Sequence, residues 1–284
     1  MQQQYIVFTE EGRAGLPPGQ PHLVHIDHRT TEEHSHIMHS HSGIVEILLI
    51  CQGHGMYCLD GRRFAISEGD VVICNSGQVH DELIYHDMPY ETLCIGVTNI
   101  RHGDLRENCL LPPGASPVFH RPAQFDELCA LLYMINHHAA ADTALDAQLC
   151  QQLMLAAVLL AGQMAGEGVA AQDTAGAPLC TRVKEYIAEH YAEALTLEAL
   201  GARFRVSPYH LAHVFKRETG YSVRQYILRR RIGEAQSLLM NTRENVTRIA
   251  EATGFDGPGH LDKLFRKYVG MSPTAYRIYR AEKQ

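Results

Sequence analysis

Four side chains in the first third of the chain have the types and the spacing of a metal-binding set. Three of them follow the pattern His39-x-His41-x4-Glu46, and His80 comes in a second segment that begins at Gly69. Side chains two positions apart on a strand point to the same face of a sheet. His39 and His41 can therefore converge with Glu46 and His80. Three imidazoles and one carboxylate can ligate a divalent ion such as Zn, Ni, Fe or Mn.

The same segment also suits an organic ligand, and the residues leave both occupants open. Glu46, Tyr57 and Glu82 can hydrogen-bond to hydroxyl groups, whereas the chain has no tryptophan to line an apolar pocket. A second His-x-His pair, His34 and His36, lies upstream of the pattern and is expected to be a decoy or a surface pair. The predicted metal ligands are His39, His41, Glu46 and His80, and the predicted effector site is His39, His41, Glu46, Tyr57, His80 and Glu82.

Short strands are expected to position these residues. Apolar runs alternate with turn signals from residue 5 to about residue 121. Asp60-Gly61, between two of these runs, is a strong signal for a two-residue hairpin. Many short strands without a long helix predict a β-barrel or jelly roll for this part of the chain.

Two helices are expected directly after the strands. Apolar residues recur at intervals of three and four over residues 125–137, and residues 145–164 are apolar almost all round. A helix of the second kind is buried on more than one side, either within its own chain alone or also against a second subunit. We favour the second interpretation and predict a homodimer through residues 122–165. The residues expected in the interface are Leu149, Leu153 and Leu160.

The last third of the chain contains one short unit twice. Leu211 and Gly220 of the first copy recur fifty positions later as Leu261 and Gly270. Each copy has a short apolar helix, a tight turn and a second helix that begins with a turn residue and a proline. A generic helical bundle is the alternative, but the cores of bundles rarely repeat in register with matched turns. The repeat therefore predicts two helix-turn-helix units.

The two parts of the chain differ in charge, and this difference indicates DNA binding. Residues 179–284 contain 18 Lys+Arg and 11 Asp+Glu, a net charge of +7, and residues 1–178 contain the other 7 and 21, a net charge of −14. A basic module suits a phosphate backbone. Between the two modules, residues 166–178 are rich in Gly and Ala, which predicts a flexible linker.

The composition predicts a cytoplasmic protein. We expect no membrane-spanning segment, because the apolar runs are too short, and no export signal, because the first residues lack a basic region followed by an apolar one. The eight cysteines form no Cys-x-x-Cys pair. They are therefore expected to be small buried thiols in a reducing compartment.

Residues 179–280 resemble the DNA-binding domain of AraC/XylS-type transcription regulators. The residues that carry the resemblance are Leu200, Ser207, Pro208, Leu211, Phe215, Lys216, Gly220, Ile249, Ala250, Gly254, Phe255, Leu261, Phe265, Gly270, Ser272, Pro273 and Tyr276. The resemblance implies a sequence-specific DNA-binding regulator under effector control, most often an activator, with double-stranded DNA and RNA polymerase as partners. The DNA-contacting positions that it implies are Tyr209, His210, Ala212, His213, Lys216 and Arg217 in the first unit, and Gly259, His260, Asp262, Lys263, Arg266 and Lys267 in the second.

Residues 20–100 resemble the two motifs of the cupin fold, which implies a small-molecule effector, such as a sugar, inside the barrel. By this resemblance His39, His41, Glu46 and His80 stand at the metal positions, and Asn75 stands where the second motif usually has proline. The alternative function is a metal-dependent cupin enzyme, or a metal sensor, fused to a DNA-binding domain. We expect no enzyme, because the barrel is joined to a DNA-binding module.

The expected fold class is α+β. A cupin-like β-barrel or jelly roll is followed by two helices, and an all-α domain of two helix-turn-helix units ends the chain. The expected boundaries are residues 1–121 for the effector-sensing domain, 122–165 for the dimerisation helices, 166–178 for the linker and 179–284 for the DNA-binding domain.

Overall fold

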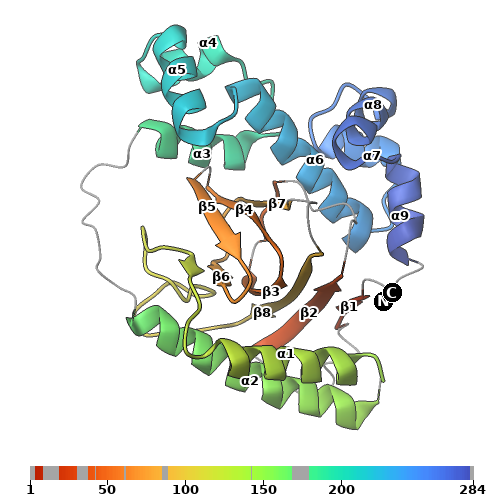
Figure 1. The fold of residues 1–284 in the computed structure, drawn as a ribbon. Coiled ribbons are helices and arrows are strands. Elements are labelled where there is room, and N and C mark those ends of the chain that lie inside the picture. Colours follow the sequence, from red (N-terminus) through yellow and green to blue (C-terminus); the bar gives the residue numbers. More distant parts are fainter. Residues whose placement is uncertain are drawn as a thin grey trace.

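The computed structural model describes residues 4–8, 19–30, 38–41, 43–60, 62–84, 89–141, 143–167 and 179–281. Within these ranges, a β-barrel lies between a pair of helices on one side and a helical domain on the other (Figure 1). The predicted α+β architecture, with a β-rich domain followed by two helices and a domain of two helix-turn-helix units, is confirmed. The upstream pair, His34 and His36, and residues 168–178 of the predicted linker lie outside the described residues.

Two antiparallel sheets form the barrel. The larger sheet has the strand order β1-β2-β8-β3-β6-β9, and the smaller has the order β5-β4-β7. The strands are β1 (Gln4–Val7), β2 (His22–Arg29), β3 (Val45–Gln52), β4 (His54–Leu59), β5 (Arg62–Ser67), β6 (Val71–Cys74), β7 (His80–Ile84), β8 (Glu91–Thr98) and β9 (Val118–Phe119).

Strand β3 shows why the larger sheet is buried on both faces. Ile47 and Leu49 pack in a core that the sheet shares with the two helices below it. Leu48 faces the other way and packs between the two sheets. Because side chains alternate along a strand, Glu46 projects to the same side as Leu48, into the interior of the barrel.

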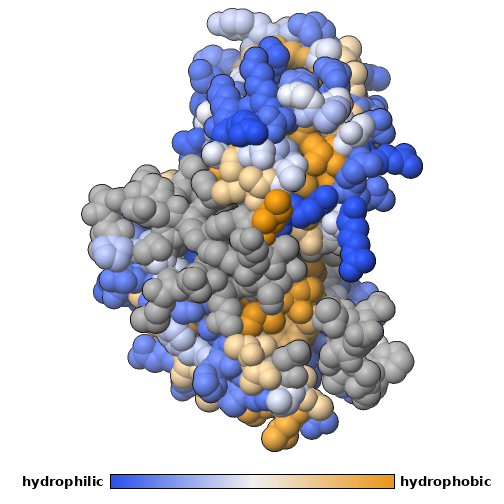
Figure 2. Space-filling view, turned by 90° about the vertical axis from the view of Figure 1, so that its right-hand side faces the viewer, coloured by the Kyte–Doolittle hydropathy of each residue, from blue (hydrophilic) through white to orange (hydrophobic). Residues whose placement is uncertain are grey.

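Helices α1 (Phe125–Ala139) and α2 (Ala144–Glu167) cover the outer face of the larger sheet (Figure 1). The sequence analysis expected no apolar segment of membrane-spanning length, and this expectation is wrong. Ala144–Gly166 is long enough and apolar enough to cross a membrane, judged by length and composition only. This helix instead packs against α1 and the barrel. It also carries more apolar surface than the contacts bury, since Leu145 and Leu159 are 75% and 74% exposed. Figure 2 shows hydrophobic side chains at the lower edge of the molecule, where α1 and α2 lie.

The carboxy-terminal domain is entirely helical within the described residues. Ser207 begins one helix, with its side chain accepting from the backbone N–H of His210 at 3.2 Å, and Pro208 follows at the first helical position. Gly220 ends that helix in the left-handed conformation, with φ of 76°. The helices are α3 (Leu179–His190), α4 (Leu197–Phe204), α5 (Pro208–Thr219), α6 (Val223–Asn241), α7 (Val246–Ala252), α8 (Pro258–Val269) and α9 (Pro273–Ala281).

Helix α6 joins the two helix-turn-helix units, α4–α5 and α7–α8. A capping box fixes its start, because Ser222 and Gln225 each bond to the other's backbone N–H. Its buried residues share one core with those of both units. Figure 1 shows that α6 also runs across the open end of the barrel, next to β4 and β7.

Candidate functional site

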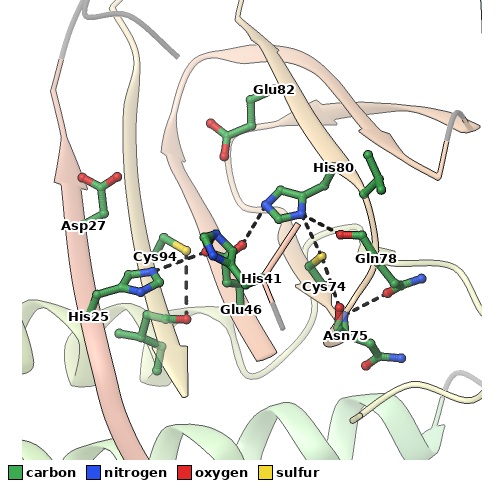
Figure 3. A network of polar contacts seen from close by, with 12 residues as sticks. His25, Asp27, His41, Glu46, Cys74, Asn75, Gln78, His80, Glu82 and Cys94 are labelled. Carbon is green, nitrogen blue, oxygen red and sulfur yellow. Dashed lines mark hydrogen bonds and ion pairs between the residues drawn. The ribbon is translucent and has the colours of Figure 1, made fainter. Parts of the chain in front are cut away.

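Glu46 is the centre of a cluster of histidines inside the barrel (Figure 3). Its Oε1 lies 3.3 Å from Nε2 of His41 and 3.3 Å from Nε2 of His25, and its Oε2 lies 2.9 Å from Nε2 of His80. The ring centroids of His39 and His80 are 4.2 Å apart. The structure thus brings together all four residues of the predicted metal set.

Two short backbone segments hold these histidines in place. The N–H of His39 donates to the carbonyl of His80 at 2.9 Å, and the N–H of His80 donates to the carbonyl of His39 at 2.8 Å. The carbonyl of His41 accepts from the N–H of Gly77 at 2.8 Å. Because the two segments are bonded to each other, the three rings are fixed relative to one another and to Glu46 on β3.

Glu46 and His80 shift each other's pKa in opposite directions. Burial raises the pKa of Glu46, but His41 and His80, with hydrogen bonds from His25 and His41, outweigh burial and hold that pKa well below its usual value. Burial lowers the pKa of His80, but Cys74 and Glu46 outweigh it and hold the pKa of His80 well above its usual value. The carboxylate form of Glu46 and the protonated form of His80 therefore stabilise each other, and a metal ion held by these residues would compete with that proton.

The neighbours of His80 orient its ring. Nδ1 of His80 lies 3.2 Å from the carbonyl of Gln78 and 3.2 Å from Sγ of Cys74, which leaves Nε2 directed at Glu46. A hydrogen bond at one ring nitrogen selects the other as the metal ligand. Tyr57 lies behind this ring rather than in the cavity, with its own ring nearly parallel to that of His80 and the centroids 6.0 Å apart.

Asn75, which stands where the second cupin motif usually has proline, makes three hydrogen bonds through its side-chain amide. Its Oδ1 accepts from the N–H groups of Leu110 and Leu111, at 2.9 and 3.1 Å, and its Nδ2 donates to the carbonyl of Leu111 at 2.8 Å. The side chain therefore ties the turn between β6 and β7 to a loop that follows β8. Proline lacks the amide group needed for these three bonds.

The donor set fits a divalent metal ion. The ligand atoms of His39, His41, Glu46 and His80 all lie within 4.8 Å of one another. In a tetrahedral site, ligand atoms about 2.0–2.2 Å from zinc lie roughly 3.3–3.6 Å from one another. A bound ion would therefore have to draw the more distant ligand atoms of this set together.

Strand β2 supplies pocket residues that sequence reasoning missed, namely His25, Asp27 and Arg29. His25 fits beside Glu46 because β8 has glycine opposite it: a Cβ on Gly96 would lie 2.2 Å from Cε1 of His25. His25, Glu46 and Cys94 form a second group that could hold a metal ion. A signal was present, since polar residues recur at every second position from His25 to Arg29.

A buried ionic chain forms the remaining wall of the site. Nε of Arg29 donates to Oδ2 of Asp27 at 2.6 Å, and Nη1 of Arg29 donates to Oε2 of Glu82 at 3.2 Å. Burial raises the pKa of Glu82, and Arg29 opposes that shift. Glu82 thus reaches the cavity, as predicted, and the wall offers two carboxylates and one guanidinium to a bound molecule.

The cavity inside the cluster is small and is closed partly by the DNA-binding domain. Its volume is about 30 Å³, which is room for an ion or one or two waters. The barrel residues that line it are His25, Asp27, Arg29, His39, His41, Glu46, His80, Glu82 and Cys94, and α6 adds Ser237 and Met240.

The predicted DNA-contacting residues lie on α5 and α8. Tyr209 is 82% exposed, and Ala212 is half-buried. Asp262 is half-buried and accepts from Nε of Arg266 at 2.8 Å, so a cation lies beside its carboxylate. The remaining predicted contacts are exposed: His210, His213, Lys216, Arg217, Gly259, His260, Lys263, Arg266 and Lys267. Hydrophilic side chains predominate on the upper part of the molecule in Figure 2, where this domain lies.

Helices α5 and α8, which carry the predicted DNA contacts, differ at their first turns. Ser207 caps α5, whereas Gly257 precedes α8 with φ of 111° and no side-chain hydrogen bond. Gly259 then leaves an exposed position of α8 without a side chain. The start of α8 is therefore the less constrained of the two.

Two families match different parts of the chain. The AraC-like ligand binding domain matches residues 21–154, and a helix-turn-helix domain matches residues 200–278. The HTH-type transcriptional activator RhaS of Citrobacter koseri is 28% identical over 256 residues, which cover 86% of this chain and 87% of the relative. The uncharacterised HTH-type transcriptional regulator YdiP of Escherichia coli K12 is 26% identical over 247 residues, 84% of this chain and 80% of the relative.

One similar solved structure is the DNA-binding domain of AdpA, a global transcriptional factor, in complex with a target DNA. It is 33% identical in sequence, and the match covers 37% of this chain and 96% of that chain with a TM-score of 0.36. The fold and the two family matches define a DNA-binding transcription regulator with a ligand-binding domain. The chain belongs to the AraC family.

Proposed function

We propose that this regulator activates transcription in response to a small polyhydroxylated effector, such as a sugar, bound beside the histidine cluster. The observation that supports this best is the wall formed by Asp27, Arg29 and Glu82. Paired carboxylates and a guanidinium hydrogen-bond to neighbouring hydroxyl groups. Activation is proposed because RhaS, which aligns over most of this chain, is a transcriptional activator. RNA polymerase is the corresponding protein partner, and the cytoplasm is the setting.

A divalent metal ion is proposed as part of the effector site. His39, His41, Glu46 and His80 would hold it, and it would supply a Lewis acid that binds ligand oxygens. Zn, Ni, Fe and Mn all accept such a set. Because the relatives are transcription regulators, we do not propose the metal-dependent enzyme or the metal sensor.

Thermal unfolding with a panel of neutral sugars and small carboxylic acids tests the effector class. A ligand at 100 times its Kd stabilises the folded protein by about 2.7 kcal/mol. Glu82→Gln should abolish the shift that a binding sugar gives, and Glu68→Gln, at an exposed turn, should keep it. A panel in which carboxylates shift the wild type and sugars do not would contradict the proposal. Elemental analysis of wild type and His41→Ala tests the metal separately.

The DNA contacts are proposed to be those predicted on α5 and α8. The two helices would enter successive major-groove segments on one face of DNA, roughly 34 Å apart. The capped start and the long side chains of α5 support the proposal that the first unit carries most of the sequence specificity. We propose the same domain boundaries that the sequence predicts, so the DNA-binding domain starts at residue 179.

A second copy of this chain is proposed to cover an apolar groove between α1 and α2. The open groove has a volume of about 550 Å³ and is lined by Glu127, Ala130, Leu131, Met134, Ala156, Leu159, Leu160 and Gln163. Of the predicted interface residues, Leu160 lines it, Leu149 is exposed beside it on the same helix, and Leu153 packs on its own core. A surface this apolar is typical of subunit contacts.

Light scattering on two matched variants tests the dimer. Leu159→Glu should give a folded monomer, because it places a charge in the groove. Leu145→Glu changes an equally exposed leucine of α2 outside the groove and should leave the mass unchanged. A dimer that persists in Leu159→Glu at the wild-type dissociation constant would refute this interface.

A further inference from the structure

One short pair of backbone segments touches both the effector pocket and the DNA-binding domain. We call residues 38–41 and 79–81 the coupling ladder, since the backbones of His39 and His80 bond to each other in both directions. Side chains alternate between the two faces of extended segments. His39, His41 and His80 therefore face the pocket, and the residues between them face away from it.

The residues that face away from the pocket contact the DNA-binding domain. Met38 and Val79 are buried in the apolar core of that domain, although both belong to the barrel. Ser40 accepts from Nη2 of Arg230 on α6 at 2.9 Å. Asp81, which is buried, pairs with Arg229 on α6. Every residue of the ladder next to a pocket histidine therefore touches or packs against the helical domain.

Helix α6 also contributes directly to the wall of the pocket. Ser237 and Met240 line the same cavity as the histidines. The cavity volume of about 30 Å³ admits an ion, whereas pockets for small organic molecules measure roughly 300 Å³ or more. A metal ion thus fits with α6 in this position, whereas an organic effector needs more room than this cavity gives. A shift of α6, which contributes Ser237 and Met240, would supply that room.

We propose that the coupling ladder links occupancy of the pocket to the docking of α6 on the barrel. This inference rests on the proposed function in that the occupant binds beside His39, His41, Glu46 and His80. An ion drawn by these ligands fixes the pocket face of the ladder and so holds Ser40 and Asp81 against α6. An organic effector, which needs the space below Ser237 and Met240, displaces α6 and changes how the two helix-turn-helix units are presented to DNA.

Because such coupling is reciprocal, it can be measured from either side with the full chain and Zn²⁺ as the probe. Arg229→Gln/Arg230→Gln removes both polar contacts of α6 with the ladder without changing a metal ligand. Arg224→Gln, an exposed arginine of the same helix, is the matched control. Backbone hydrogen exchange is followed in residues 38–41, residues 79–81 and Val223–Asn241, and Zn²⁺ affinity is measured by competition with a chelator.

Without metal, the double variant should exchange faster than wild type at residues 38–41 and 79–81, and the control should not. With Zn²⁺, exchange in Val223–Asn241 should slow in the wild type, and the double variant should bind Zn²⁺ about fivefold or more weakly. If the double variant does not fold, Ser40→Ala, which removes the acceptor of Arg230, takes its place.

Unchanged exchange in the metal-free ladder would overturn the coupling. So would Zn²⁺ binding that leaves α6 exchange unaltered. If wild-type protein does not bind Zn²⁺ at all, the metal part of the proposed function fails, and the metal-free comparison alone decides for or against the ladder.

Discussion

Gly96→Ala tests the geometry of the pocket through one methyl group. The new Cβ would lie 2.2 Å from Cε1 and 2.4 Å from Nδ1 of His25, whereas ordinary contacts begin near 3.4 Å. The ring must therefore retreat by about 1.2 Å in a site that is tightly packed. Overpacking of this kind costs roughly 1–3 kcal/mol of the free energy of unfolding. The displaced ring should also disturb the 3.3 Å contact between Nε2 of His25 and Oε1 of Glu46.

Urea denaturation followed by circular dichroism measures this cost, and a double-mutant cycle assigns it to the ring. In a His25→Ala background the ring is gone, so Gly96→Ala should cost less than about 0.5 kcal/mol there. The interaction energy between the two positions should then equal most of the single-variant cost. Equal costs of Gly96→Ala in both backgrounds would show that the backbone of β8, rather than His25, rejects the methyl group, and would refute the reasoning.

Three further predictions concern the helices. His213→Ala should cost about 1–3 kcal/mol of the DNA-binding free energy at the base pairs that His213 contacts and should relax the sequence preference there. Lys263→Ala should weaken binding to all DNA sequences and reduce the slope of log affinity against log salt concentration by about one. A scan of every operator position that finds equal sequence preference opposite both helices would contradict this. Ser207→Ala should lower the free energy of unfolding by about 1 kcal/mol, and Thr196→Ala, at the matching cap of α4, provides a second measurement of the same effect. Hydrogen bonds from Thr143 and His138 hold the pKa of Asp146 below its usual value. The stability that Asp146 contributes is therefore present above its unfolded-state pKa and is lost as the pH falls through its folded-state pKa. Asp146→Asn should remove this part of the pH dependence of the melting temperature, and an unchanged pH profile would count against the prediction.

Helix positions in the DNA-binding domain could be predicted because their signals are local. Ser207, Pro208 and Gly220 mark the ends of α5 by side-chain and backbone chemistry that acts within a few residues. The shared face of His39 and His41 was predictable for the same reason, since a two-residue period fixes which side chains lie together. Their approach to Glu46 on β3 was predicted through the resemblance to the cupin motifs. The pocket residues of β2 (His25, Asp27 and Arg29) were not predicted, because polar side chains at every second position of a strand are also typical of a face exposed to solvent.

Contacts between the two domains could not be predicted, because no local pattern encodes them. Arg229, Arg230 and Arg231 contributed to the basic charge from which DNA binding was predicted. The first two contact the barrel, and Arg231 donates to the carbonyls of Tyr191, Glu193 and Gly254. Counting charge along the sequence therefore overstates the number of cations that face phosphate.

Side chains of the coupling ladder point alternately to the pocket and to α6, so a change in the number of its residues is more disruptive than a substitution. A conservative substitution at Ser40 changes one contact, whereas the insertion of one residue between His39 and His41 would put these two side chains on opposite faces. One of the two imidazoles would then point at α6 instead of into the pocket. Variation in homologous chains should therefore appear here as replacement of residues, and changes in length should be confined to segments outside residues 38–41 and 79–81.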